Sequence, residues 1–209
     1  FLVMEQSKKH ISIGTDTSLN DGEKQNIVKS IQDLLKESEI DPYSDIKEPP
    51  IALQIDNMTF ATLGNFSCIT GKPKSRKTYF LSLIIASTLC NNQNKKITTN
   101  LSKTCVLHFD TEQSRYHTQK VSRRILSLTN NKEISQENYK CYCLRPYSPE
   151  ERKKIIMEAI YNAKNVKFVF IDGIADLIVG YNNEESAINI INDLMKWTAE
   201  LKIHLITIV

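Results

Sequence analysis

Residues 66–80 read FSCITGKPKSRKTYF, and three kinds of sequence follow one another within this stretch. The apolar segment 66–70 is typical of a strand. It leads into the octapeptide Gly71-Lys72-Pro73-Lys74-Ser75-Arg76-Lys77-Thr78, in which four side chains are basic. The apolar run 79–89 comes next, and its length favours a buried helix over a strand. The stretch therefore predicts a strand, a basic loop and a helix in direct succession.

The order of a strand followed by a helix is repeated through the rest of the chain. The pattern predicts strands over 105–110, 139–144, 167–172 and 203–209, and helices over 115–128, 149–163 and 184–201. Such alternation predicts an α/β fold with a mostly parallel sheet covered by helices on both faces. Before the loop, residues 51–55 and 58–61 predict a hairpin, whereas the polar segment 91–100 predicts a loop.

The first fifty residues differ in character from the remainder. A helix is predicted from about Glu23 to Glu39, with Asn20 or Asp21 as its N-cap. The segment DPYSDIKEPP (41–50) contains three prolines and several charges, which is typical of a linker. We therefore expect a small N-terminal helical appendage with its linker over 1–50 and an α/β core over 51–209.

Composition excludes several classes of protein. The 209 residues are 41% apolar and 24% charged, with a net charge of +3, which is too small to indicate nucleic-acid binding alone. No apolar run reaches the roughly 18 residues of a membrane span, and no signal-peptide pattern opens the chain. The five cysteines lack CxxC spacing, and Cys68 and Cys105 lie in segments predicted as buried strands. These features predict a cytoplasmic protein without disulfides.

The basic octapeptide matches the phosphate-binding pattern GxxxxGK[ST] at every position but one. In that pattern the backbone N–H groups at a helix N-terminus converge on phosphate oxygens. Lys77 would reach the β- and γ-phosphates and Thr78 would bind Mg²⁺, while Gly71–Arg76 and Tyr79 would surround the nucleotide. Arg76 stands where the pattern has its second glycine, so a Cβ limits the approach of the backbone. An ordinary basic turn, without nucleotide, is the alternative.

Two acidic positions complete the pattern. Asp172 ends the apolar segment 168–171, where it would contact Mg²⁺, although a turn-forming aspartate is the alternative. Glu112 follows the strand 105–110 and would activate a water molecule, with Asp110 as the competing candidate. Asp110 and Thr111 also suit a cap for the next helix. Asp176 is interpreted first as a turn or capping residue and second as an accessory metal ligand.

With these segments in order, the chain resembles RecA-like P-loop ATPases. Among them it is most similar to plasmid-replication hexameric helicases and related AAA-family ATPases of bacterial mobile elements. The resemblance covers 51–209, and it implies a core that continues beyond Val209 into a His or Gln sensor, a DNA-binding loop and an Arg or Lys finger. A nucleotide-binding regulatory or assembly module without turnover, and a RadA-type recombinase, are the alternatives.

The resemblance also implies the chemistry and the partners. ATP would be hydrolysed to ADP with Mg²⁺, Lys77 and Glu112 would be catalytic, and Thr78 and Asp172 would hold the metal ion. A homo-oligomeric ring, such as a hexamer, would act on single-stranded DNA as a helicase or loader. Three arginines near the helix after Glu112 could contact the phosphates or a neighbouring subunit: Arg115, Arg123 and Arg124. Lys95, Lys96 and Lys103 could touch nucleic acid, but a solvated loop is the favoured interpretation.

Overall fold

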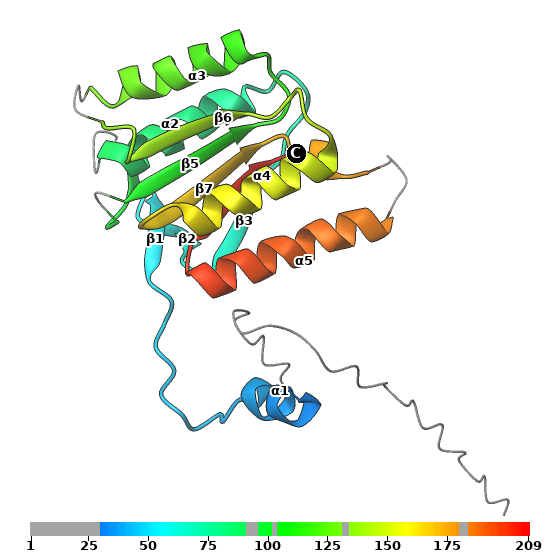
Figure 1. Cartoon of the computed structure of the whole chain (residues 1–209). Helices are drawn as coiled ribbons and strands as arrows, with labels where there is room; N and C mark the ends of the chain where they lie inside the picture. The colour runs from blue at the N-terminus through cyan, green and yellow to red at the C-terminus, as the bar shows by residue number, and fades with distance from the viewer. Residues whose placement is uncertain (1–29, 91–95, 102–103, 131–133, 180–183) are drawn as a thin grey trace, which may run out of the picture. The chain divides into compact units, whose positions relative to one another are not determined.

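The computed structural model of the chain describes residues 30–90, 96–101, 104–130, 134–179 and 184–209 (Figure 1). The chain divides into two compact units, Phe1–Ile46 and Lys47–Val209. The division falls inside the proline-containing segment 41–50.

The described part of the first unit contains the helix α1 (Ile31–Ser38). Its N-cap is Ser30, whose hydroxyl oxygen accepts the Asp33 N–H at 3.1 Å while the Asp33 carboxylate accepts the Ser30 N–H at 3.2 Å. Because this capping box fixes where the helix begins, α1 begins at Ile31 and not at the predicted Glu23. Residues 23–29 lie outside the described part of the chain.

The second unit is built on a five-stranded sheet in the order β3-β8-β7-β5-β6, with every neighbouring pair parallel. The strands are β3 (Asn65–Ile69), β5 (Cys105–Asp110), β6 (Tyr139–Cys143), β7 (Val166–Asp172) and β8 (His204–Ile208). The prediction of a mostly parallel sheet is therefore confirmed. Strands β3 and β6 form the two edges, and Cys68 of β3, predicted to be buried, is exposed at its edge.

Helices cover both faces of this sheet, as predicted. Helices α2 (Lys77–Cys90) and α3 (Arg115–Leu128) lie on one face, and α4 (Pro149–Asn162) and α5 (Glu184–Leu201) lie on the other (Figure 1). The central strands are buried on both sides, because Val106 packs into the core beneath α2 and α3 whereas Leu107 packs into the core beneath α4 and α5. None of the described helices combines the length and apolar character that a bilayer span requires.

A smaller antiparallel sheet has the order β2-β1-β4 and consists of β1 (Ile51–Ile55), β2 (Met58–Thr62) and β4 (Ile97–Thr98). The predicted hairpin is confirmed, and Asp56 and Asn57 at its turn both have positive φ, as two-residue hairpin turns favour. Strand β4 contradicts the prediction of a loop over 91–100. Ile97 and Thr98 pair with β1, but two residues are too few to produce a periodic signal.

The order of the strands creates a crevice at their carboxyl ends. The chain passes from β5 through α3 to the edge strand β6, whereas it passes from β7 through α5 to β8 in the opposite direction. The loops after β5 and β7 therefore diverge, and parallel sheets bind ligands at such points.

Candidate functional site

The loop Gly71–Thr78 connects β3 to α2, as predicted, and α2 begins at Lys77. The Arg76 carbonyl accepts the N–H groups of Tyr79 at 3.0 Å and Phe80 at 3.1 Å, so it starts the helical turn. Lys74 and Arg76 both have φ of 65°, in the left-handed region, whereas Gly71 does not have a positive φ. The loop thus places two basic residues in the conformation that glycine adopts most easily.

Lys77 lies in the first turn of α2 with its side chain folded back over the loop. Its Nζ donates to the Gly71 carbonyl at 2.6 Å. The ammonium group is therefore held against the loop whose N–H groups would surround a phosphate. A phosphate oxygen that replaced the Gly71 carbonyl would leave Lys77 with an equivalent acceptor of higher charge.

The carboxylate of Asp172 at the end of β7 and the Thr78 side chain at the start of α2 line the same cavity, and Thr78 favours the charged form of that carboxylate. Asp172 is only 4% exposed, and its Oδ2 has no hydrogen-bond partner among the described residues. Burial raises the pKa of Asp172 to about 6; the neighbouring Thr78 side chain opposes the rise, and the negative charges of Asp110 and Glu112 add to it. A buried carboxylate with one unpaired oxygen is suited to a cation.

A cavity of ≈ 440 Å³ brings most of the predicted site residues together. Its walls are Pro73–Thr78 from the loop and the start of α2, Glu112 after β5, Asp172 at the end of β7, and Ile208 with Val209. Gly71, Lys72 and Tyr79, which were predicted to surround a nucleotide, do not line this cavity. The described residues contain no group of three or more His, Cys, Asp or Glu side chains placed to hold a metal ion by themselves.

Asp110 and Glu112 differ sharply in their surroundings. Asp110 is fully buried; its Oδ1 accepts the N–H groups of Glu112 at 3.2 Å and Gln113 at 2.9 Å, and its Oδ2 accepts the Thr118 hydroxyl at 2.9 Å. Its carboxylate is thus occupied in fixing the turn that leads into α3. Glu112 is exposed in the cavity wall. The geometry favours Glu112 over Asp110 as the residue that would face a ligand.

Thr111 joins the ends of β5 and β7, a role that the sequence analysis missed. Its hydroxyl lies 2.8 Å from the carbonyl oxygens of Asp172 and Gly173 and 2.9 Å from Asp176 Oδ2. Gly173 has φ of 98°, and a Cβ there would overlap Thr111 Oγ1 and lie 2.9 Å from Glu112 Cγ. Asp176 lies in a short 3-10 helix, η1 (Ile174–Leu177), and supports this joint. The glycine directly after Asp172 was the available signal.

A second cavity of ≈ 570 Å³ lies between the start of α2 and the middle of α3. It shares Arg76 and Thr78 with the first cavity and adds Tyr79, Gln113, Val121 and Arg124. The Arg124 guanidinium donates to Ser82 Oγ at 2.9 Å, and its Cζ lies 5.1 Å from the centroid of the Tyr79 ring. Arg124 therefore belongs to the surroundings of the loop within the same chain.

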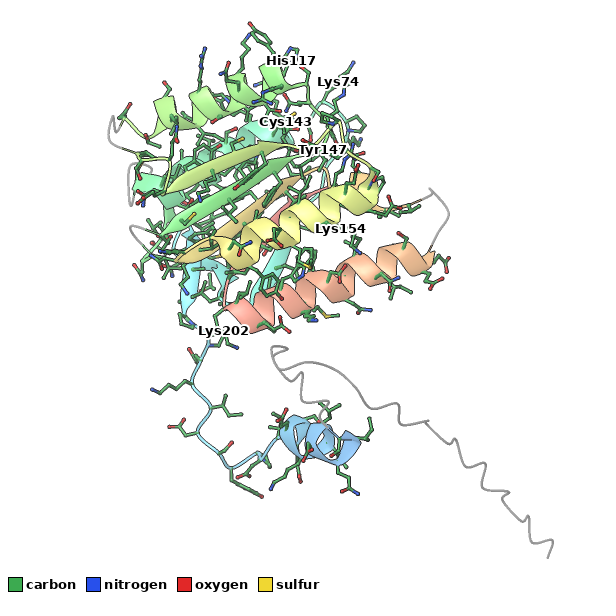
Figure 2. The ribbon with its side chains drawn as sticks, in the orientation of Figure 1. Lys74, His117, Cys143, Tyr147, Lys154 and Lys202 are labelled. Atoms are coloured by element: carbon green, nitrogen blue, oxygen red, sulfur yellow. The ribbon has the colours of Figure 1, made fainter. Side chains whose placement is uncertain are left out.

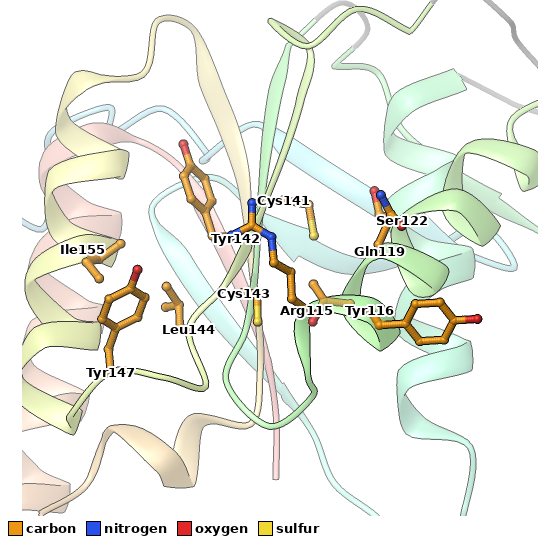
Figure 3. A pocket seen from close by; sticks show the side chains of 11 residues that line it. Arg115, Tyr116, Gln119, Ser122, Cys141, Tyr142, Cys143, Leu144, Tyr147 and Ile155 are labelled. Atoms are coloured by element: carbon orange, nitrogen blue, oxygen red, sulfur yellow. The ribbon is translucent and has the colours of Figure 1, made fainter.

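A groove of ≈ 640 Å³ follows the edge strand β6 between α3 and α4 (Figure 3). Figure 3 shows Arg115 beside Tyr142 in its middle, with Tyr147 on one side and Gln119 on the other. No acidic side chain lines it. The Cys143 thiol contacts the Gln113 carbonyl at 3.4 Å, so the floor of the groove touches the loop that carries Glu112. Arg123 is exposed on α3.

Of the three lysines considered as contacts for nucleic acid, Lys96 lies in the described part of the chain. Lys96 lies 3.9 Å from the Asp56 carboxylate at the hairpin turn, and both side chains are well exposed. Lys95 and Lys103 lie outside the described residues. The exposed Lys96–Asp56 ion pair contributes little to the free energy of unfolding, because water screens both charges.

Comparisons of the sequence with known protein families and with curated proteins find no match. The interpretation of the site therefore rests on the arrangement of its residues.

Proposed function

We propose that residues 51–209 form a RecA-like P-loop domain that binds ATP with Mg²⁺ and hydrolyses it to ADP and phosphate. One observation carries the proposal. Thr78 from the loop and Asp172 from the end of β7 line one cavity together with Lys77 and Glu112, and Asp172 keeps one buried oxygen unpaired. These residues come from three separate segments of the chain, and chance would not be expected to gather them.

The residues fit a magnesium ion. Mg²⁺ prefers one or two protein oxygens and completes its octahedron with water and substrate phosphates, so Thr78 and Asp172 suffice as protein ligands. When bound, the ion would offset phosphate charge and orient the phosphates. It would also lower the pKa of Asp172, whose charged form burial now disfavours.

The chain's own residues would divide the remaining work. The N–H groups at the start of α2 would bind phosphate oxygens, and Lys77 would leave the Gly71 carbonyl to contact the β- and γ-phosphates. Glu112 would accept a proton from the attacking water as the new P–O bond forms and the bond to the β-phosphate oxygen breaks. Asp110 would hold Glu112 in place through the Glu112 N–H.

We further propose that this ATPase drives a DNA-replication helicase or loader of a mobile element, working as a homo-oligomeric ring. The resemblance of the sequence motifs motivates this part. A supporting observation is that α3 carries four Lys or Arg residues and no Asp or Glu. Between Arg115 and Tyr147 the chain has seven Lys or Arg residues against two Glu. Cationic surfaces with tyrosines are typical of sites that bind single strands.

The test compares Lys77→Ala and Glu112→Gln with matched surface variants. Lys154→Ala on α4 (Figure 2) and Glu185→Gln on α5 remove the same charges from exposed positions, and neither residue lines the cavities described above. Affinity for Mg²⁺–ATP is measured by calorimetry and phosphate release by a coupled assay, with and without single-stranded DNA. We expect Lys77→Ala to weaken binding about tenfold to hundredfold. Glu112→Gln should bind nearly as wild type and hydrolyse about 10²- to 10⁴-fold more slowly.

The outcomes separate the alternatives. Equal loss of binding in both site variants would contradict the assigned roles. Binding without phosphate release in the wild-type protein would favour the regulatory module, for which the left-handed Arg76 in the loop is the supporting observation. A closed ring or a filament in electron micrographs distinguishes a helicase from a RadA-type recombinase.

A further inference from the structure

Arg76 occupies a strained position that a glycine would occupy without strain. Its φ of 65° costs a residue with a Cβ stability that glycine does not lose. The conformation itself is needed, because the Arg76 carbonyl accepts two N–H groups of the first turn of α2. Strained backbone of this kind gathers at functional sites. Arg76 is therefore a candidate for a residue whose side chain has a functional role.

Arg76 stands between the two cavities of the site. Arg76 and Thr78 are the two residues that line both the ≈ 440 Å³ cavity with Asp172 and the ≈ 570 Å³ cavity with Arg124. Lys74 has the same φ of 65° but lines the first cavity alone. The two strained basic residues therefore differ in what their side chains reach.

The second cavity collects positive charge, and its walls contain no acidic side chain. Arg76 and Arg124 both line it, and no Asp or Glu does. Arg124 is fixed by Ser82 and lies over the Tyr79 ring, so its guanidinium remains at the cavity. The two positive charges repel each other across the cavity, and an anion bound between them would attract both.

We propose that Arg76 is a phosphate-binding residue that contacts the terminal phosphate of a nucleoside triphosphate from the side of the second cavity. The inference rests on the proposed function. The two cavities would lie on either side of this phosphate. Glu112, which would activate the attacking water, lines the first cavity, and its neighbour Gln113 lines the second. Because a diphosphate lacks that terminal phosphate, an arginine that contacts it would favour triphosphates over diphosphates.

The test is a series at one position: Arg76→Lys, Arg76→Gln and Arg76→Gly, with calorimetric affinities for ATP and ADP in the presence of Mg²⁺. Glutamine keeps the strained backbone and removes the charge, whereas glycine removes both. We expect ATP affinity to fall about tenfold to hundredfold in the glutamine and glycine variants and less in the lysine variant. ADP affinity should fall much less. Lys74→Gln should weaken ATP and ADP by similar factors.

The opposite order of ATP affinities among the Arg76 variants would overturn the inference. If strain alone mattered, Arg76→Gly would bind ATP more tightly than wild type while Arg76→Gln remained unchanged. Equal ratios of ATP to ADP affinity in Lys74→Gln and Arg76→Gln would also exclude the role. A wild-type protein that binds no nucleotide refutes the proposed function itself, whereas binding that Lys77→Ala removes and the Arg76 series leaves intact refutes only this inference.

Discussion

Replacing Gly173 by alanine tests the joint between β5 and β7 that holds the candidate site together. Gly173 has φ of 98°, and a Cβ would overlap Thr111 Oγ1 and lie 2.9 Å from Glu112 Cγ and 3.1 Å from Glu112 Oε1. Thr111 is buried and its hydroxyl lies within bonding distance of Asp172, Gly173 and Asp176. The substitution therefore forces either the backbone of β7 or the Thr111 side chain to move.

The expected loss of stability has three contributions. The left-handed backbone costs alanine about 1–2 kcal/mol. Crowding of Thr111 and Glu112 adds about 1–3 kcal/mol. The lower entropy of alanine in the unfolded chain returns about 0.4–1 kcal/mol. The net loss is about 1–4.6 kcal/mol, which lowers the Tm by about 2–18 °C for a chain of this size.

Gly64→Ala is the matched control. Gly64 also has a positive φ, 86°, but a Cβ there meets no atom within 4 Å. Strain without crowding should cost about 0–1.6 kcal/mol after the entropy gain. Thermal unfolding followed by circular dichroism compares the two variants with wild type. A Cβ at Gly173 meets Thr111 and Glu112, whereas a Cβ at Gly64 meets neither. Gly173→Ala should therefore also lower phosphate release, and Gly64→Ala should not.

A similar Tm for both glycine variants would refute the reasoning, because crowding would then contribute nothing. Retained stability together with lost activity would also contradict it, since the joint is argued to support both.

Two further predictions concern ionisation. Folding raises the pKa of Asp172 from 3.8 to about 6, so its ionisation opposes folding and stability declines as pH rises through that window. Without metal, Asp172→Asn should raise the free energy of unfolding above pH 6 by up to about 3 kcal/mol. Urea titrations near pH 4 should show no such gain. A variant less stable than wild type at pH 7.5 contradicts the prediction. Burial lowers the pKa of His108 from 6.5 to about 4, so its stabilising neutral form is lost as pH falls through that range. In the Asp172→Asn background, His108→Gln should reduce the acid slope by about 1.4 kcal/mol per pH unit, and an unchanged slope counts against it.

Local patterns predicted the elements well because each one has a periodic or compositional signal. The hairpin 51–61 and the buried strand 105–110 are examples, since turn residues mark the first and unbroken apolar character marks the second. Strand β4 was missed because its pairing with Gln54 and Ile55 is a tertiary event. The order of the strands was equally invisible, because no periodicity encodes which strand lies beside which.

The candidate site was predicted residue by residue but not as a geometry. Motif spacing indicated Thr78, Glu112 and Asp172, yet it could not reveal that the three residues line one cavity or that one Asp172 oxygen is buried without a partner. Asp110 was left as a competitor because a strand-end carboxylate gives the same signal whether it caps a helix or faces a ligand. The roles of Thr111 and Arg124 depend on partners more than 40 residues away in sequence.

The position of β8 has a consequence for the order in which the domain assembles. Strand β3 pairs in the parallel sheet only with β8, whose partner residues follow more than 130 positions later, from Asn65 to His204. During synthesis, the loop and α2 therefore emerge long before the strand that fastens them to β7. Such non-local pairing delays folding and leaves strand edges exposed in the meantime. A ribosome-bound chain that stops before His204 should therefore leave β3 without its partner strand in the parallel sheet.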